Sequence, residues 1–138
     1  KEMIRLVVAR GPNDKFEQYL EPSLKNFPNV EAVQVHNEEN DSIFKKYNRA
    51  VRVMDIKDDD VIVFCHADVK IMDPLFEKKL QILFEKKKDI GLLGLIGTTE
   101  FPTAGGWWLN DHSLHRGHLM QGAPGSNGEK TFHMVRKI

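Results

Sequence analysis

The chain has 138 residues, the size of one domain with a single hydrophobic core. Its 20 basic residues balance 20 acidic ones, so no net charge attracts nucleic acid or an anionic membrane surface. The single cysteine excludes an intrachain disulfide, and no apolar stretch approaches the roughly 20 residues of a membrane span. We therefore expect a cytoplasmic protein that does not bind nucleic acid.

The chain opens with a predicted strand, Ile4–Ala9, which is rich in branched residues and ends at Arg10-Gly11-Pro12-Asn13. Asp14 and Glu17 resemble a capping box, so we expect a helix to follow. Pro22 must kink or restart that helix. Its apolar residues recur at near-helical intervals: Phe16, Leu20, Leu24 and Phe27.

A second strand is predicted over Val30–His36, where apolar and polar residues alternate before the acidic loop Asn37–Asp41. That loop is long enough to contact a ligand. Ser42 is a suitable cap for a second helix. This helix carries one apolar stripe, made of Ile43, Tyr47, Ala50, Val51 and Met54.

The most informative segment is the apolar run Val61–Cys65, which leads directly into His66-Ala67-Asp68. A continuous apolar run of this length predicts a central parallel strand. Ligands of open α/β sheets bind at the carboxyl ends of such strands, so Asp68 is expected at a binding crevice. Within the strand, Cys65 is expected to be a small buried hydrophobe and not a nucleophile.

A third helix is predicted after Asp73-Pro74, which place a cap before a proline at the first helical position. Ile90–Ile96 is then predicted to be another central strand. The resulting β-α-β-α-β-α-β order predicts an α/β fold with a mostly parallel sheet covered on both faces. The buried face of the third helix comprises Phe76, Leu80, Leu83 and Phe84.

From Gly97 to Gly128 the chain is rich in glycine, and we expect loops or short irregular strands there. Trp107 and Trp108 follow two glycines and could stack on sugar rings, or equally fill a hydrophobic gap under the loop. A zinc site built from His112, His115 and His118 is disfavoured, since Gly117 argues against a helix that would align them. A single histidine of this set, His118 or His115, is the better candidate ligand.

Together these residues resemble the family 2-like glycosyltransferases of the GT-A fold, over about residues 3–110. The resemblance is closest to the branch with a His-x-Asp version of the usual Asp-x-Asp motif. It implies a three-layer αβα, Rossmann-like fold, formed as one domain over 1–138, with a nucleotide-binding core over 3–96 and a donor and acceptor loop region over 97–138. A shortened member with an incomplete acceptor side is expected. The matching segments are Ile4–Ala9, Tyr47–Ala50, Val61–Asp68 and Gly105–Trp108.

The resemblance also implies a nucleotide-sugar site and a divalent metal, Mn²⁺ or Mg²⁺. The metal would be bound by Asp68, with His66 or His118 as further candidate ligands. The residues expected to bind the donor are Ala9, Arg10, Asn37, Glu38, Asn48, His66, Ala67, Asp68, Gly105, Gly106, Trp107 and Trp108. For several of these an ordinary role is an open alternative: Arg10 as a solvated loop residue, Asn48 as a surface position of its helix, and Asp68 as a cap of the following segment.

The implied activity is transfer of a sugar from a nucleotide-diphosphate donor, most simply a UDP-sugar, to an unidentified acceptor. No residue is assigned as the catalytic base, and a homo-oligomer is one way to complete the site. The alternative is a non-catalytic α/β domain that binds a nucleotide, a nucleotide sugar or a protein partner at the same strand ends. A nucleotidylyltransferase-like enzyme is disfavoured because the loop after the first strand, at Arg10–Pro12, has a single glycine.

Overall fold

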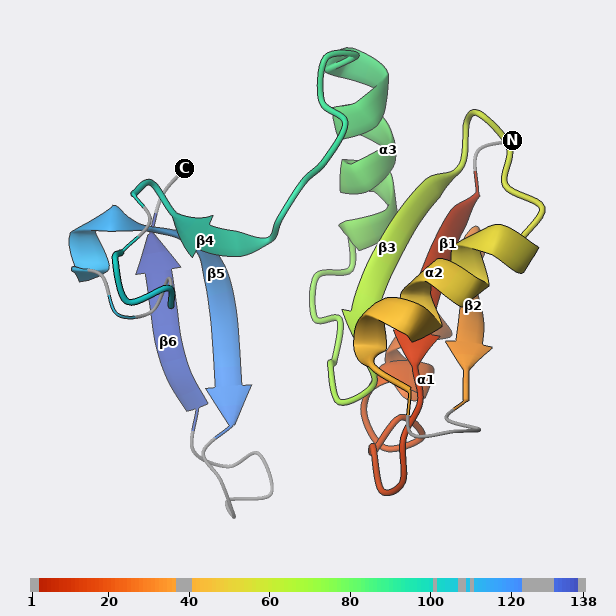
Figure 1. The fold of residues 1–138 in the computed structure, drawn as a ribbon. Coiled ribbons are helices and arrows are strands. Elements are labelled where there is room, and N and C mark those ends of the chain that lie inside the picture. Colours follow the sequence, from red (N-terminus) through yellow and green to blue (C-terminus); the bar gives the residue numbers. More distant parts are fainter. Residues whose placement is uncertain are drawn as a thin grey trace. The chain divides into compact units, whose positions relative to one another are not determined.

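The computed structural model describes residues 3–36, 41–100, 102–106, 109, 111–122 and 131–136. The chain divides into two compact units, Lys1–Asp89 and Ile90–Ile138 (Figure 1). The single domain over 1–138 stays a prediction. Within the described residues, no helix is both long enough and apolar enough to cross a membrane.

The first unit contains a parallel sheet of three strands, β1 (Ile4–Ala9), β2 (Val30–Val35) and β3 (Val61–His66). The strand order is β2-β1-β3, so the first strand lies in the middle. This confirms the predicted α/β class. The central position predicted for β3 is wrong in the part of the chain that is described, because β3 pairs there with β1 alone.

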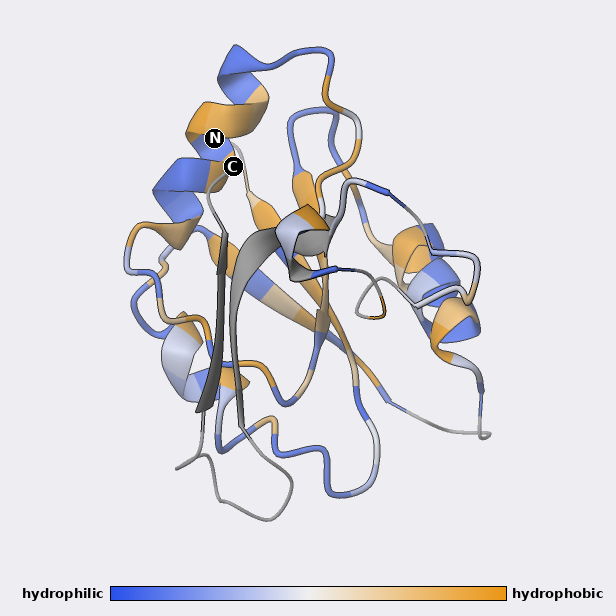
Figure 2. Ribbon diagram, turned by 90° about the vertical axis from the view of Figure 1, so that its left-hand side faces the viewer, coloured by the Kyte–Doolittle hydropathy of each residue, from blue (hydrophilic) through white to orange (hydrophobic). Residues whose placement is uncertain are grey.

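Helices cover both faces of this sheet, as Figure 1 shows for α1 (Leu20–Leu24), α2 (Ile43–Val53) and α3 (Phe76–Lys86). Successive strand residues point to opposite faces, so β1 contributes to two apolar clusters. One cluster packs against α2 and is formed by Val7, Val35 and Ala50. The other includes the α1 side and is formed by Leu6, Val8, Phe16, Leu20 and Ala67. In Figure 2 the strands of this sheet carry mostly hydrophobic colours, whereas α2 and α3 change between hydrophobic and hydrophilic along their length.

Two of the predicted helix starts differ in outcome. Ser42 caps α2 as expected, since its hydroxyl oxygen accepts a hydrogen bond from the backbone N–H of Lys45 at 3.4 Å. The capping box at Asp14 is wrong, and α1 begins only at Leu20. Asn13 and Lys15 have left-handed backbones, with φ of 58° and 60°, so a helix cannot pass through this loop.

The second unit contains an antiparallel sheet in the order β4-β5-β6, made of β4 (Ile96–Thr98), β5 (His115–Gly122) and β6 (Thr131–Arg136). A 3₁₀ helix, His112–Leu114, precedes β5. The parallel strand predicted over Ile90–Ile96 is wrong: residues 90–95 form no strand, and Ile96 pairs antiparallel with Gly117. Two glycines in this run weaken its strand preference, and the pairing partner of Ile96, Gly117, lies 21 residues further on, where local pattern carries no signal.

β5 lies entirely within the segment that was expected to form loops or short irregular strands. Its sequence, His-Arg-Gly-His-Leu-Met-Gln-Gly, is polar and contains two glycines, so neither alternation nor composition indicates a strand. Pairing with β6 supplies the missing stabilisation, because Gly117 to Gly122 align with Arg136 to Thr131. The element therefore forms through a tertiary contact that overrides local propensity.

Candidate functional site at the carboxyl edge of the first sheet

The candidate site lies where β1 and β3 end. Ala9, the last residue of β1, pairs with Val35 of β2 on one side and with His66 of β3 on the other. The chain thus leaves β1 towards β2 and later returns to the opposite side of β1. In open parallel sheets this change of direction marks the binding region, at the carboxyl ends of the strands. The topology therefore supports the predicted location.

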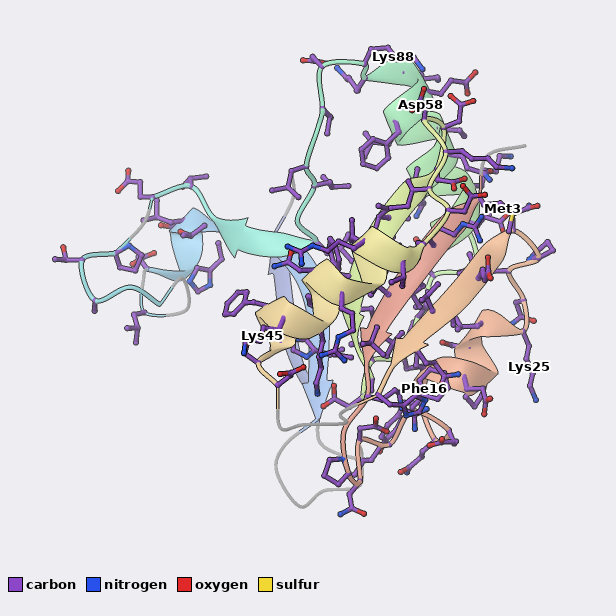
Figure 3. All side chains as sticks on the ribbon, turned by 45° about the vertical axis from the view of Figure 1, so that its right-hand side comes forward. Met3, Phe16, Lys25, Lys45, Asp58 and Lys88 are labelled. Carbon is purple, nitrogen blue, oxygen red and sulfur yellow. The ribbon has the colours of Figure 1, made fainter. Side chains whose placement is uncertain are left out.

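The two ends of the sheet differ in what they carry (Figure 3). Phe16 and Lys45 lie towards the carboxyl end, whereas Met3 and Asp58 lie towards the amino end. At the amino end the carboxylate of Asp60 is 2% exposed and accepts a hydrogen bond from the backbone N–H of Met3 at 3.3 Å. Asp60 thereby joins the start of β3 to the start of β1 in a structural role.

After β1 the chain forms a loop held together by Arg10. The Arg10 Nε donates to Asp14 Oδ2 at 2.6 Å, and Nη2 donates to Glu17 Oε1 at 2.8 Å. Nη1 donates to the side-chain oxygen of Gln34, and the guanidinium carbon lies 4.3 Å from the ring centre of Phe16. We call these five side chains the Arg10 cluster.

Ionisation within the Arg10 cluster is strongly coupled. The hydrogen bond from Arg10 lowers the pKa of Asp14 to about 2, helped by backbone N–H groups of Gly11 and Phe16. The same guanidinium lowers the pKa of Glu17, and its own pKa is raised by its hydrogen bond to Asp14. Two carboxylates thus face one guanidinium, so Arg10 brings no net positive charge to this end of the sheet.

The predicted triplet His66-Ala67-Asp68 divides into two exposed side chains and one buried one. His66 ends β3 and is exposed, as is Asp68 in the turn that follows. The Ala67 side chain is 5% exposed and belongs to the core cluster with Leu6 and Val8. Among the described residues, Asp68 receives no hydrogen bond and forms no ion pair. The carboxylate of Asp68 is therefore available to a ligand. Ala67 can contact a ligand only through its backbone, because its side chain is buried.

Cys65 is the residue before this triplet, and its surroundings keep the thiol protonated. Burial, together with the nearby negative charge of Asp68, raises the pKa of the Cys65 thiol to about 11. The Tyr47 hydroxyl donates to the Cys65 carbonyl oxygen at 3.3 Å and so connects α2 to β3. Burial raises the pKa of Tyr47. The expectation that Cys65 is not a nucleophile agrees with this environment.

Three residues of the helix α2 bear on the predicted donor site, and the role of Asn48 there stays a prediction. Asn48, expected to approach the nucleoside, is exposed, two positions from each of the buried residues Lys46 and Ala50. Arg49 forms an ion pair with Asp41. Sequence reasoning overlooked Lys46, which is buried and whose Nζ donates to the carbonyl oxygen of Arg10 at 3.1 Å. Its position three residues after Ile43 and four before Ala50 places it on the apolar stripe, which is the signal that could have identified it.

The remaining predicted residues lie in the second unit or outside the described residues. Gly105 and Gly106 lie in the second unit, where the N–H of Gly105 donates to the carbonyl oxygen of Pro102 at 2.9 Å and closes a turn. His118 lies on β5 with its side chain outside the described part, and His115 is buried. Four predicted residues lie outside the described residues altogether: Asn37, Glu38, Trp107 and Trp108.

The described residues do not form a complete metal site by themselves, because no three side chains of His, Cys, Asp or Glu gather around one point. A divalent cation that is shared with phosphates needs less from the protein, since Mg²⁺ is commonly held by one or two carboxylates plus phosphate oxygens. Asp68 offers one such carboxylate, and the imidazole of His66 is a donor better suited to Mn²⁺. The donor set fits a cation that arrives with a diphosphate.

Comparison with known protein families gives a match. The family described as "Glycosyltransferase like family" matches residues 17–137, which is most of the chain and includes β2, β3 and the second unit. No curated protein and no solved structure gives a significant match.

Proposed function

The chain belongs to the glycosyltransferase-like family, and from that premise we propose that it transfers a sugar from a nucleotide-diphosphate donor, most simply a UDP-sugar, to an acceptor hydroxyl. The observation that carries the proposal is the carboxylate of Asp68. It is exposed and has no partner among the described residues, at the end of a strand beside the middle strand of a parallel sheet. That is where an open α/β sheet binds its ligand.

The donor would lie along the carboxyl ends of β1 and β3. Asp68 and His66 would hold a divalent cation, Mn²⁺ or Mg²⁺, which when bound neutralises charge on the departing diphosphate. The backbone of Ala9 and Ala67 would line the same edge, since Ala9 pairs with His66. We further propose that Trp107 and Trp108 contact the donor sugar, because an aromatic face suits the apolar C–H surface of a sugar ring.

Ligand-induced stabilisation tests this proposal. A ligand that binds only the folded state, present at a concentration one hundred times its Kd, stabilises the protein by about 2.7 kcal/mol. This raises the melting temperature by several degrees. We expect UDP with Mn²⁺ to raise the melting temperature of the wild type and not that of Asp68→Ala. Asp58→Ala is the matched control, because Asp58 is an exposed carboxylate at the opposite end of the sheet.

Turnover separates an enzyme from a binding domain. UDP-, GDP- and dTDP-sugars are incubated with the protein and Mn²⁺, and release of the nucleoside diphosphate is measured. Release that depends on Asp68 supports the transferase. Binding without release from any donor favours a non-catalytic nucleotide-sugar domain, and no thermal shift with any nucleoside diphosphate removes the glycosyltransferase proposal.

A further inference from the structure

Lys46 is a buried cation at the carboxyl end of the middle strand. The residue is 8% exposed and lies in the first turns of α2, on the face that also buries Ala50. Its Nζ donates a hydrogen bond to the carbonyl oxygen of Arg10, the residue that follows β1, at 3.1 Å. The ammonium group is therefore held at the point where β1 ends, between the ends of its two neighbours.

The charge of Lys46 differs from the charges nearby, which are paired with carboxylates or exposed to solvent. Arg10 is paired with Asp14, Arg49 is paired with Asp41, and the side chain of Lys45 is 75% exposed. Across the described residues, no carboxylate forms an ion pair with Lys46. An ammonium group has three N–H donors, and here a neutral carbonyl accepts one of them.

Packing alone does not explain a charge at this position. Burying an ammonium group beside one neutral acceptor costs free energy, and a methionine would fill similar space without that cost. Lysine stems often lie along apolar surface, but they usually carry the charged end out to water. A buried lysine whose ammonium group has a single acceptor among the described residues, placed at the carboxyl edge of an open sheet, is suited to an anionic ligand.

We propose that Lys46 binds the diphosphate of the nucleotide donor, an inference that rests on the proposed function. Its ammonium reaches the end of β1, while Asp68 follows the end of the adjacent β3. A diphosphate at this edge is then held by a protein cation as well as by any cation that Asp68 binds. Part of the affinity for the diphosphate consequently persists without metal. This compensates for the single aspartate in the triplet His66-Ala67-Asp68.

The test compares Lys46→Met with Lys45→Met, the adjacent and exposed lysine on the same helix. Binding of UDP, uridine and inorganic pyrophosphate is measured by calorimetry, in Mn²⁺ and again in EDTA. Since a hydrogen bond to a charged group is worth about ten- to a hundredfold in affinity, we expect Lys46→Met to weaken UDP and pyrophosphate by roughly that factor in both conditions. Uridine binding stays unchanged, as does every affinity of Lys45→Met.

Two further measurements separate a binding role from a structural one. Lys46→Met should melt at the wild-type temperature or above it, since the variant removes a buried charge. In the wild type, pyrophosphate should slow acylation of Lys46, read by mass spectrometry. Equal UDP and pyrophosphate affinities in the wild type and Lys46→Met overturn the inference, as does equal weakening of uridine and UDP. If the wild type binds no nucleoside diphosphate, the proposed function fails, and Lys46 is then judged by pyrophosphate alone.

Discussion

Replacing Asp14 by asparagine tests whether the Arg10 cluster is structural. The substitution keeps the shape of the side chain and removes the charge that pairs with Arg10. The two carboxylate oxygens of Asp14 each accept a hydrogen bond from a backbone N–H, that of Gly11 at 2.9 Å and that of Phe16 at 3.1 Å, and asparagine, with one side-chain oxygen, keeps only one of them. Any loss of stability therefore reports on the ion pair with Arg10 together with one backbone hydrogen bond.

The magnitude follows from the pKa of Asp14, which falls from an ordinary 3.8 to about 2 in the folded protein. A difference of this size corresponds to about 2 kcal/mol, and screening by solvent at this surface loop reduces it to about 1–2 kcal/mol. Because the folded pKa is the lower one, the contribution is complete above pH 4 and is lost as the pH falls towards 2. Asp14→Asn should thus lower the free energy of unfolding by about 1–2 kcal/mol at pH 7.

The difference in free energy of unfolding between the wild type and Asp14→Asn is measured by urea unfolding, monitored by circular dichroism, at pH values from 7 to 2. We expect less than about a quarter of it to remain at pH 2. Asp58→Asn is the control, since Asp58 is exposed and makes no hydrogen bond or ion pair with the described residues; its stability should match the wild type at every pH. A difference between Asp14→Asn and the wild type that does not change with pH, or no difference at pH 7, would refute the assigned role of the ion pair.

Three further predictions concern backbone and thiol. Gly105 has a φ of 84°, so Gly105→Ala should lower the free energy of unfolding by about 1–2 kcal/mol, whereas Gly91→Ala should lower it little. Unfolding is monitored by tryptophan fluorescence, and equal effects of the two substitutions would contradict this prediction. Lys15→Gly should leave stability unchanged or raise it because φ is 60° there, whereas Lys78→Gly inside α3 should cost about 1 kcal/mol by the same urea assay. Cys65 should react with iodoacetamide at pH 8 about a hundredfold more slowly than in urea, since its pKa is near 11; similar rates would show that the thiol is accessible as thiolate.

The sequence was most informative where local pattern and tertiary structure agree. β1 was predicted with its observed bounds, and Ser42 was identified as the cap of α2, because a buried parallel strand and an N-cap each have a local signature. The loop after β1 was misread as a helix because Asp14 bonds to Arg10 and to nearby N–H groups, an arrangement that a capping-box pattern does not distinguish. The strand predicted over Ile90–Ile96 was placed wrongly because its pairing depends on β5, about 20 residues away in the sequence.

The candidate site was predictable in position and less so in its charges. The triplet ending at Asp68 placed it at a strand end, and the sheet order agrees with that location. The availability of each cation depends on contacts across the sequence: Arg10 meets Glu17 seven residues on, and Lys46 meets the carbonyl of Arg10 from 36 residues away. The resemblance named Arg10 as a donor-binding residue, with a solvated loop residue as the open alternative, whereas within the described residues Arg10 is paired with carboxylates and Lys46 is not.

The middle position of β1 also bears on how the first unit folds. Both partners of β1, β2 and β3, come later in the chain, and each parallel pairing requires a crossover of more than a dozen residues. During synthesis β1 therefore has neither neighbour until Val30–Val35 emerges, and its second edge stays open until Val61–His66 follows. Formation of the sheet must close these long loops first, which makes folding of this unit slow compared with a helical bundle of similar size.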